Sequence, residues 1–233
     1  MRPLTDGVTV IIPTFNEAES IVAVVAELPR TIVNRIIVAD GGSSDGTPER
    51  ARAAGAEVVP VGRGYGLACL AGAKAAGSND ILIYMDGDGA DDPAAIENLV
   101  APIRVGDSDF VIASRARGER EPGSMAPHQL LAGLIAGRLT GLLYGVRYTD
   151  MCAFRAIRRD TLLALDMREE TYGWNLEMQM RAAQCGLRIH EIPVSCRKRA
   201  GGVSKVAGSL SGSFRAAIRI TQTLLRVAST PKP

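Results

Sequence analysis

The chain has 233 residues, of which 46% are hydrophobic and 22% are charged, as is typical of a globular protein with a sizeable core. Its formal net charge of +2 is too small to indicate a nucleic-acid-binding protein. No run approaches ~18 uninterrupted apolar residues and the N-terminus has no apolar signal core, so we expect neither a transmembrane helix nor a secretory signal.

The first half of the chain alternates between two kinds of pattern. Apolar, β-branched runs predict strands at 8–13, 35–40, 56–60, 80–85 and 109–114. Helical spacing of apolar residues, with capping and turn residues before it, predicts helices that begin after Asn16, near Pro48, at Tyr65 and at Pro93. This alternation predicts an α/β fold with a mainly parallel central sheet and helices on both faces.

The stretch at residues 79–93 carries the clearest chemical signal. The apolar run from Ile81 to Met85 leads directly into Asp86-Gly87-Asp88. Two carboxylates one residue apart, at the carboxyl end of a central strand, can hold one hard divalent cation and leave positions for phosphate oxygens. Taken alone, the same pattern is more often an exposed acidic turn.

Other polar loops follow the first two predicted strands. Asn16 and Glu17 come after the first, and Asp40 and Asp45 come at and after the end of the second. In a parallel sheet these loops open on the same crevice as the Asp86 loop. Negative charge gathered in one cleft requires a metal ion or hydrogen-bonding partners such as ribose and base. A nucleoside diphosphate with Mg²⁺ or Mn²⁺ satisfies both requirements, whereas Asp45 beside Gly46 is expected to be a turn-former.

The second half is less regular. A polar loop is expected at 115–127, an apolar glycine-rich helix at 128–146, a helix at 175–185, a strand at 188–194 and a last helix at 206–228. In the last helix Arg215, Arg219 and Arg226 share one face, which makes it a basic amphipathic helix. Such a helix usually packs on its own domain, although it can also lie on an anionic membrane.

Several short motifs together resemble the signature of family 2 glycosyltransferases, and more narrowly the dolichyl- or polyprenyl-phosphate mannosyl- and glucosyltransferases. They lie at 13–17, 39–47, 63–66, 86–88, 149–155, 173–178 and 199–205. The resemblance implies the GT-A fold and one glycosyltransferase domain over 1–233. Its parts would be a nucleotide-sugar half at 1–115, an acceptor half at 116–205 and the basic C-terminal helix at 206–233.

The resemblance also implies roles for particular residues. The nucleotide-sugar site would be formed by Pro13, Phe15, Glu17, Asp40, Arg63, Asp86, Gly87 and Asp88, and Asp86 and Asp88 would hold Mg²⁺ or Mn²⁺. Acceptor and phosphate contacts would come from Arg115, Arg117, Arg155, Arg199, Ser204 and Lys205. The catalytic residues would be Asp88, Asp150, Glu177, Arg199 and Lys205.

Two positions depart from the family pattern. Gly41 stands where similar enzymes usually have a second aspartate, and Ala90 stands where they often have a glutamine that assists the metal. Asp91, or water, would then substitute for the glutamine.

The expected reaction is inverting transfer of a hexose from UDP-glucose or GDP-mannose to a polyprenyl or dolichyl phosphate. A lipid phosphate is already ionised and needs only cations to hold it, whereas a hydroxyl acceptor would need Asp150 or Glu177 as a base. The alternatives are transfer to a sugar or polysaccharide hydroxyl, and an inactive nucleotide-sugar-binding scaffold. The four cysteines show no paired spacing, which favours reduced thiols in a cytoplasmic protein. The lipid-phosphate acceptor and the basic amphipathic helix lead us to expect peripheral contact with the inner face of the membrane.

Overall fold

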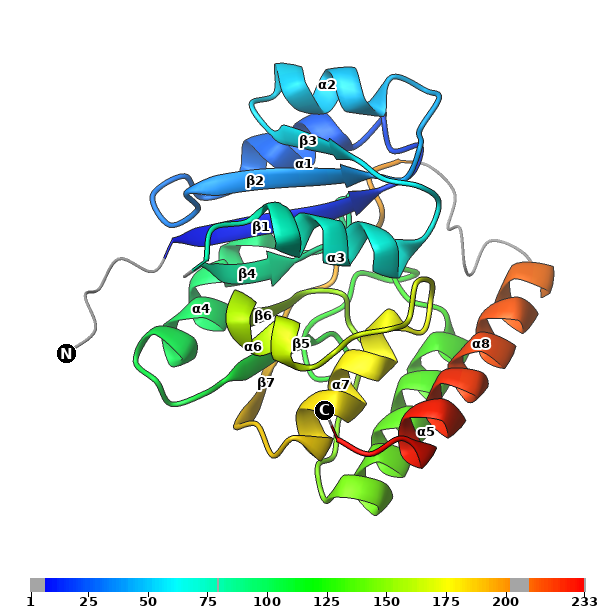
Figure 1. The fold of residues 1–233 in the computed structure, drawn as a ribbon. Coiled ribbons are helices and arrows are strands. Elements are labelled where there is room, and N and C mark those ends of the chain that lie inside the picture. The colour runs from blue at the N-terminus through cyan, green and yellow to red at the C-terminus, as the bar shows by residue number, and fades with distance from the viewer. Residues whose placement is uncertain (1–6, 79, 202–209, 233) are drawn as a thin grey trace.

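A seven-stranded sheet runs through the molecule in the order β3-β2-β1-β4-β6-β5-β7 (Figure 1). The computed structural model describes residues 7–78, 80–201 and 210–232, and the side chains of all of these except 210–217. Its strands are β1 (Val8–Thr14), β2 (Arg35–Asp40), β3 (Glu57–Pro60), β4 (Ile81–Tyr84), β5 (Phe110–Ser114), β6 (Arg155–Arg158) and β7 (Ile189–Pro193). Among these strands β6 alone runs opposite to the others, so the predicted mainly parallel α/β sheet is confirmed.

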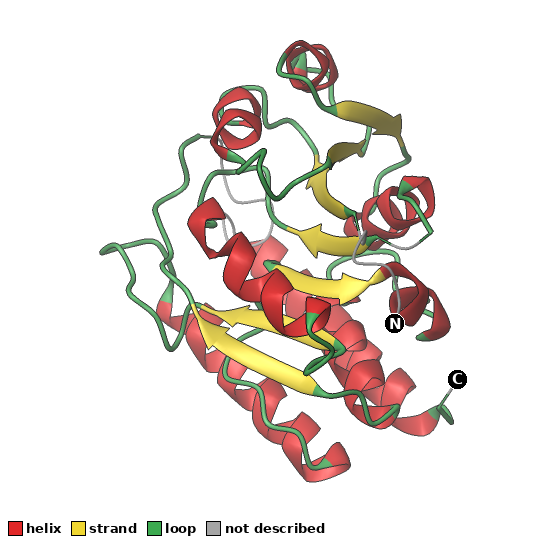
Figure 2. Ribbon diagram, turned by 90° about the vertical axis from the view of Figure 1, so that its left-hand side faces the viewer, coloured by secondary structure: helices red, strands yellow, loops and turns green. Residues whose placement is uncertain are grey.

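Helices cover both faces of this sheet (Figure 2). They are α1 (Ile21–Glu27), α2 (Thr47–Ala53), α3 (Tyr65–Ala75), α4 (Ile96–Arg104) after a short 3₁₀ turn η1 (Pro93–Ala95), α5 (Pro127–Tyr144), α6 (Arg159–Ala164), α7 (Trp174–Gln184) and α8 (Leu210–Ser229). In Figure 1, α3 and α6 lie in front of the sheet, and α1 and α4 lie behind it. Helices α5 and α8 both pack on α7, at the end of the molecule away from β3.

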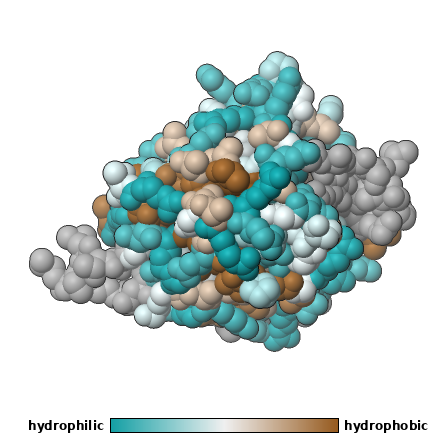
Figure 3. Space-filling view, turned by 90° about the horizontal axis from the view of Figure 1, so that it is seen from above, coloured by the Kyte–Doolittle hydropathy of each residue, from teal (hydrophilic) through white to brown (hydrophobic). Residues whose placement is uncertain are grey.

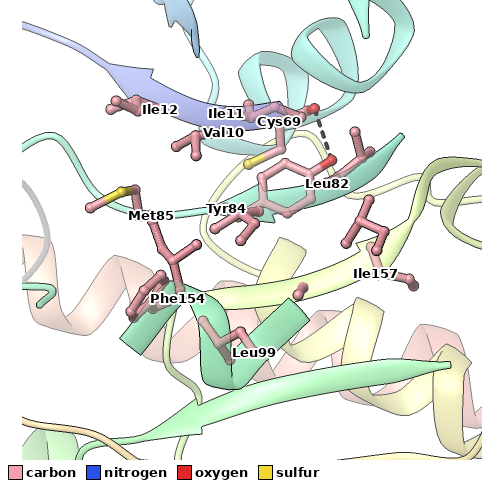
Figure 4. Close-up of a cluster of buried hydrophobic side chains, with 14 of the residues drawn as sticks. Val10, Ile11, Ile12, Cys69, Leu82, Tyr84, Met85, Leu99, Phe154 and Ile157 are labelled. Atoms are coloured by element: carbon pink, nitrogen blue, oxygen red, sulfur yellow. Dashed lines mark hydrogen bonds between the residues drawn. The ribbon is translucent and has the colours of Figure 1, made fainter. Parts of the chain in front are cut away.

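The core is built around the central strands, whose side chains are buried on both faces as the apolar runs predicted. Side chains of β1, β4, α3 and α4 interlock in it (Figure 4). The one polar atom of Tyr84 is accommodated because its hydroxyl donates a hydrogen bond of 3.2 Å to the carbonyl oxygen of Cys69. The buried strands therefore form a rigid base from which the loops at their carboxyl ends project.

Two details of the prediction were wrong. The first helix begins at Ile21 rather than after Asn16, because Asn16 takes a left-handed conformation (φ 54°) and its side-chain oxygen accepts a hydrogen bond from the Ser44 amide. Asn16 thus joins the loops after β1 and β2 instead of capping a helix. Strand β6 and helix α6 were not predicted, because a four-residue strand with arginine at both ends carries neither an apolar run nor alternation.

Helix α5 packs inward through small residues. Its buried positions are Gly133, Ala136, Gly137 and Thr140, while large aliphatic residues between them are exposed. A Cβ atom on Gly137 would lie 1.8 Å from the carbonyl oxygen of Tyr148, so the backbone of α5 can approach the segment before Asp150 only because this residue is glycine. No described helix is both long enough and apolar enough to cross a membrane.

The face beside α2 and β3 has a different character. Seen from above it is mainly hydrophilic, with apolar atoms scattered between polar ones (Figure 3). Such a mixture is ordinary for a protein surface.

We predict that Gly137→Ala lowers the free energy of unfolding by about 2 kcal/mol, because the added methyl group collides with the Tyr148 carbonyl. Urea unfolding followed by circular dichroism measures this change. The matched control is Gly133→Ala in the same helix, where the nearest atom to the new Cβ is 3.4 Å away. Alanine's higher helix propensity should leave that variant equal to wild type or up to about 1 kcal/mol more stable. Equal stability of the two variants would contradict the close approach.

Candidate active site

A cavity of about 1060 Å³ opens at the carboxyl ends of β1, β2 and β4. Its walls include the end of β1 and the loop after it (Pro13, Phe15 and Glu17), Gly41 after β2, and, after β4, Asp86, Gly87, Asp88, Ala90 and Asp91. Residues from the second half of the chain complete it: Arg115, Gly123, Ser124, Ala126, Gln129, Thr171, Tyr172, Cys196, Lys198 and Arg199. The loops expected to converge after these strands therefore do meet in one cavity.

Carboxylates are concentrated at the β4 side of this cavity. Asp88 and Asp91 are nearly fully buried, and Asp91 Oδ2 accepts a hydrogen bond of 3.0 Å from the amide of Asp86. Burial, together with the charges of Asp88 and Asp91, raises the pKa of Asp86 to about 8, and burial and Asp88 raise the pKa of Asp91 to about 6. The cluster thus holds more negative charge than its protein surroundings compensate.

These residues fit a divalent cation. Carboxylate oxygens are the hard ligands that Mg²⁺ and Mn²⁺ accept, and a positive ion would relieve the repulsion among Asp86, Asp88 and Asp91. Within the described residues no group of three His, Cys, Asp or Glu side chains is arranged as a complete metal site. Protein carboxylates would therefore supply part of the coordination, with phosphate oxygens and water as the remaining ligands.

Arg199 reaches the carboxylates from the opposite wall. Its Nη1 lies 2.7 Å from Asp88 Oδ2 and its Nη2 lies 3.5 Å from Glu17 Oε1. The strand-like segment that carries it is fixed on the β4 loop, because the amides of Arg197 and Ala200 donate to the carbonyls of Ala90 and Asp88 at 2.9 and 2.8 Å. Arg199 therefore stands over the proposed metal ligands as an additional positive charge.

Two more arginines face the cavity, and each is positioned by a neighbour. The guanidinium carbon of Arg63 lies 4.2 Å from the centre of the Phe15 ring, a cation–π contact. Arg115 donates to Asp150 from its backbone amide, Nε and Nη2 at 2.8–3.0 Å. Burial alone would raise the pKa of Asp150, but the bonds from Arg115 outweigh it and the pKa is lowered. Asp150 is consequently an ionised carboxylate that orients Arg115.

Asp40 does not line the cavity as the resemblance suggested. It is buried, and its two oxygens accept hydrogen bonds from Thr14 Oγ1, the Gly42 amide, and the amide and hydroxyl of Ser43. These bonds close the turn after β2, so it is the next residue, Gly41, that faces the cavity. A Cβ on Gly41 would lie 3.2 Å from the Thr14 carbonyl, which leaves little room for the family's usual aspartate without a small backbone shift.

Glu177 is also placed away from the cavity. Its side chain is fully buried, Oε2 accepts from the amides of Arg168 and Glu169, and Oε1 pairs with Arg226 of α8 at 2.8 Å. The physical reason for the difference is that α7 turns this side of the helix toward α8. We therefore remove Glu177 from the set of reacting groups.

Glu169 forms the second half of this network. Nearly fully buried, it accepts from Thr171 and Thr223 and pairs with Arg219 at 2.9 Å and Arg226 at 3.5 Å. The next residues, Thr171 and Tyr172, line the cavity, so this network ties helix α8 to the cavity wall. The basic side of α8 thus points partly at the protein's own carboxylates.

Two predicted phosphate ligands are likewise elsewhere. Arg155 on β6 is fully buried and donates to the carbonyls of Cys152, Ala153 and Asn175, and burial lowers its pKa. Arg117 is half exposed outside the cavity and donates to the Glu191 carbonyl at 2.8 Å. Both arginines hold backbone segments together. Ser204 and Lys205 lie outside the described residues.

Several lining residues had no role in the prediction from sequence, among them Tyr172, Gln129 and Lys198, and Tyr65 entered it only as part of the motif at 63–66. Tyr172 reaches the cavity because its loop packs directly on the start of α3, where Cβ atoms on Gly64 and Gly66 would lie 2.6 and 2.0 Å from the carbonyls of Glu170 and Glu169. The closely spaced glycines at 64 and 66 were the available signal for this close approach.

Comparisons with known proteins agree with this geometry. Residues 9–165 match the family model described as glycosyl transferase family 2. An uncharacterized glycosyltransferase of Mycobacterium tuberculosis is 37% identical over 90% of this chain and 94% of its own. The undecaprenyl-phosphate mannosyltransferase of Micrococcus luteus is 33% identical over 95% and 93%. The glucosyl-3-phosphoglycerate synthase of M. tuberculosis, solved with Mn²⁺, UDP-glucose and phosphoglyceric acid, superimposes with a TM-score of 0.78 at 22% identity, covering 98% of this chain and 82% of the other.

We predict that Glu177→Gln lowers the free energy of unfolding by about 2 kcal/mol, because it leaves Arg226 without its closest carboxylate and weakens the bonds to two backbone amides. Chemical unfolding measures the loss. Glu97→Gln is the control, since Glu97 forms an exposed pair with Arg104 at 3.6 Å and should contribute less than about 1 kcal/mol. If Glu177→Gln is as stable as wild type, the structural role of Glu177 is wrong.

Proposed function

Because the chain belongs to glycosyl transferase family 2 and has the GT-A fold, we propose that this glycosyltransferase moves a hexose from a nucleotide sugar to a polyprenyl phosphate, with inversion at the anomeric carbon. UDP-glucose and GDP-mannose are the proposed donors. The M. luteus relative is named for transfer of mannose to undecaprenyl phosphate, which supports a lipid-phosphate acceptor in this chain.

One observation carries the choice of acceptor. The two carboxylates that the sequence predicted as a base for a hydroxyl acceptor are both engaged: Asp150 by Arg115, and Glu177 by Arg226 and the 168–169 amides. Besides the β4 carboxylates and Glu17, the described part of the cavity presents positive charge from Arg63, Arg115, Lys198 and Arg199. A phosphate monoester is an ionised nucleophile at pH 7 and needs cations rather than a base.

The donor would occupy the side formed by the loops after β1, β2 and β4. Phe15, stacked under Arg63, offers an aromatic face for the base, and Gly87 lies between Asp86 and Asp88 in the cavity wall. A divalent cation held by Asp86 and Asp88 would supply Lewis-acid stabilisation of charge on the leaving diphosphate. Arg199 would add a guanidinium that can bond phosphate oxygens in pairs.

Donor departure then requires little proton chemistry. As the bond from the anomeric carbon to the diphosphate breaks, negative charge grows on the leaving group, and the cations that surround it stabilise that charge. The acceptor oxygen, held by Arg115, attacks from the opposite face of the sugar, which gives inversion. Asp150 acts here as a positioning residue, because its two oxygens fix the Arg115 guanidinium.

A hydroxyl acceptor remains the second candidate, and Asp91 is the observation in its favour. This carboxyl lines the cavity, and its raised pKa suits a general base near neutral pH. Comparing turnover on a polyprenyl phosphate with turnover on the corresponding sugar hydroxyl separates the two candidates. The inactive scaffold, the third alternative, predicts nucleotide-sugar binding without transfer to either acceptor. For its location we propose the cytoplasmic face of a membrane, where lipid phosphate is accessible.

We predict that UDP-glucose or GDP-mannose raises the unfolding midpoint only when Mn²⁺ or Mg²⁺ is present, and that Asp88→Asn abolishes the metal-dependent part of the shift. A ligand that binds only the folded protein stabilises it by mass action, so a thermal-shift titration measures the effect. Asp107→Asn, which removes one exposed carboxylate elsewhere, should keep the full shift. An equal shift in Asp88→Asn would remove Asp88 from the metal site.

We predict that Arg115→Ala raises the KM for polyprenyl phosphate by about 10- to 100-fold, because one or two charge-assisted hydrogen bonds to the phosphate are lost. The KM for the nucleotide sugar should stay within about twofold. Arg117→Ala is the matched control, since Arg117 is two residues away and outside the cavity. Steady-state kinetics with each substrate varied in turn measures both KM values for the two variants. Equal effects of Arg115→Ala and Arg117→Ala would place the acceptor elsewhere.

A further inference from the structure

Helix α5 turns its large apolar side chains toward solvent. We define its outer face as Leu131, Leu134, Ile135, Leu139, Leu142 and Leu143, which are between 37% and 82% exposed. They recur at intervals of three and four residues, so they form a continuous stripe along one side of the helix. A contiguous apolar patch on a protein surface marks an interaction site far more often than isolated exposed leucines do.

The inner side of α5 shows that this orientation is fixed. Gly133, Ala136, Gly137 and Thr140 face the protein, and Gly137 lies against the Tyr148 backbone. Rotating the helix to bury its leucines would drive bulky side chains into that close contact. The orientation of the apolar stripe is therefore fixed by the packing of α5 on the protein.

The charge around the outer face is of one sign. In the sequence no Asp or Glu occurs between Glu121 and Asp150, or after Glu191. Arg138 is exposed in the middle of the stripe and Arg147 is exposed just beyond its end. A long cationic side chain among leucines suits the boundary between acyl chains and anionic headgroups, where its stem contacts lipid and its charge reaches phosphate.

Helix α8 contributes less to such a surface than its sequence indicated. Arg219 and Arg226, two of the three arginines on its predicted basic face, pair with the buried Glu169 and Glu177. Carboxylates of the protein itself therefore neutralise much of the charge of Arg219 and Arg226. Six of the twelve large hydrophobic side chains that are exposed in the described part of the chain lie on α5, and the exposed Arg138 lies among them.

A second copy of the chain fits this face less well. In a two-fold symmetric pairing through α5 the same patch meets itself, and Arg138 lies near the middle of the helix. Two Arg138 side chains would approach each other across an apolar interface, and the sequence around them provides no carboxylate to compensate. An anionic membrane supplies that compensation from its headgroups.

We propose that the outer face of α5 is the surface by which this protein docks on an anionic lipid bilayer, with the leucines in the acyl boundary and Arg138 at the headgroups. The start of α5 borders the cavity, since Ala126 and Gln129 line it. Docking along α5 therefore brings the cavity mouth to the membrane. The role of this docking in reaching a lipid acceptor rests on the proposed function, whereas the docking surface itself is inferred from the exposed leucines and the charge around them.

Vesicle flotation of the full chain tests the proposal. Vesicles of phosphatidylcholine with phosphatidylglycerol, and vesicles of phosphatidylcholine alone, are used without any polyprenyl phosphate. We expect wild type to bind the anionic vesicles and the double variant Leu134→Gln/Leu142→Gln to bind at least about tenfold more weakly, because two apolar side chains no longer insert. Arg138→Glu should lose the preference for anionic over neutral vesicles.

The matched control is Val22→Gln/Val105→Gln, which removes two exposed apolar side chains outside α5 and should bind like wild type. Equal loss in the control, or no binding by wild type, overturns the proposal. So does a wild-type dimer, detected by sedimentation equilibrium, that the leucine variant converts to monomers while neither binds vesicles.

A second assay separates this proposal from the proposed function. Turnover on a short, water-soluble isoprenyl phosphate without vesicles should be within about twofold of wild type in the leucine variant. If that turnover is present but wild type ignores vesicles, the docking surface is wrong and the proposed function stands. If vesicle binding depends on the leucines but no isoprenyl phosphate is glycosylated, the docking surface stands and the proposed acceptor fails.

Discussion

The crowding of three carboxylates in the loop after β4 is the constraint on which the rest of the site depends. Asp86, Asp88 and Asp91 follow a rigid apolar strand, and burial together with the charges of neighbouring carboxylates raises the pKa of Asp86 and Asp91. The chain compensates from a distance: residues 196–201 run back along the β4 loop, and their backbone hydrogen bonds hold Arg199 over Asp88. Under the proposed function such a cleft would be preorganised for a metal-bound diphosphate, because the metal would meet the carboxylates and the phosphates would meet Arg199 without rearrangement.

Buried ion pairs elsewhere in the molecule also fix the positions of the groups that they join. Arg115 with Asp150, and Arg226 with Glu177, are pairs in which at least one partner is nearly fully buried. Breaking such a pair leaves a buried charge uncompensated, so these pairs fix geometry strongly even where their net stabilisation is small. In one pair the geometry fixed is that of a cavity arginine; in the other it is the packing of a helix. The chemistry of an Arg–carboxylate pair does not by itself distinguish a functional role from a structural one.

Because of this ambiguity, only part of the site could be predicted from the sequence. The central strands, the convergence of the loops after them, and the positions of Asp86 and Asp88 follow from local patterns and the geometry of parallel sheets. The positions of Glu177 and Arg155 could not be predicted in this way. Their orientation depends on β6, which has no local signal, and on contacts between α7 and α8 that are distant in sequence, since Glu177 and Arg226 are 49 residues apart. Asp40 was expected to face the cavity, but both of its side-chain oxygens accept hydrogen bonds within the turn that follows β2.

The Glu169 network has a consequence for how this protein can change. The loop that contributes Thr171 and Tyr172 to the cavity is held by side chains of α8, rather than by strand pairing. A change in the last helix therefore also affects the cavity wall. Exchanging the C-terminal segment for one without arginines at 219 and 226 would leave Glu169 and Glu177 without the cations that neutralise them. Recombination that respects these contacts must carry residues 168–177 together with the C-terminal helix, which makes the two segments a single module despite their distance along the chain.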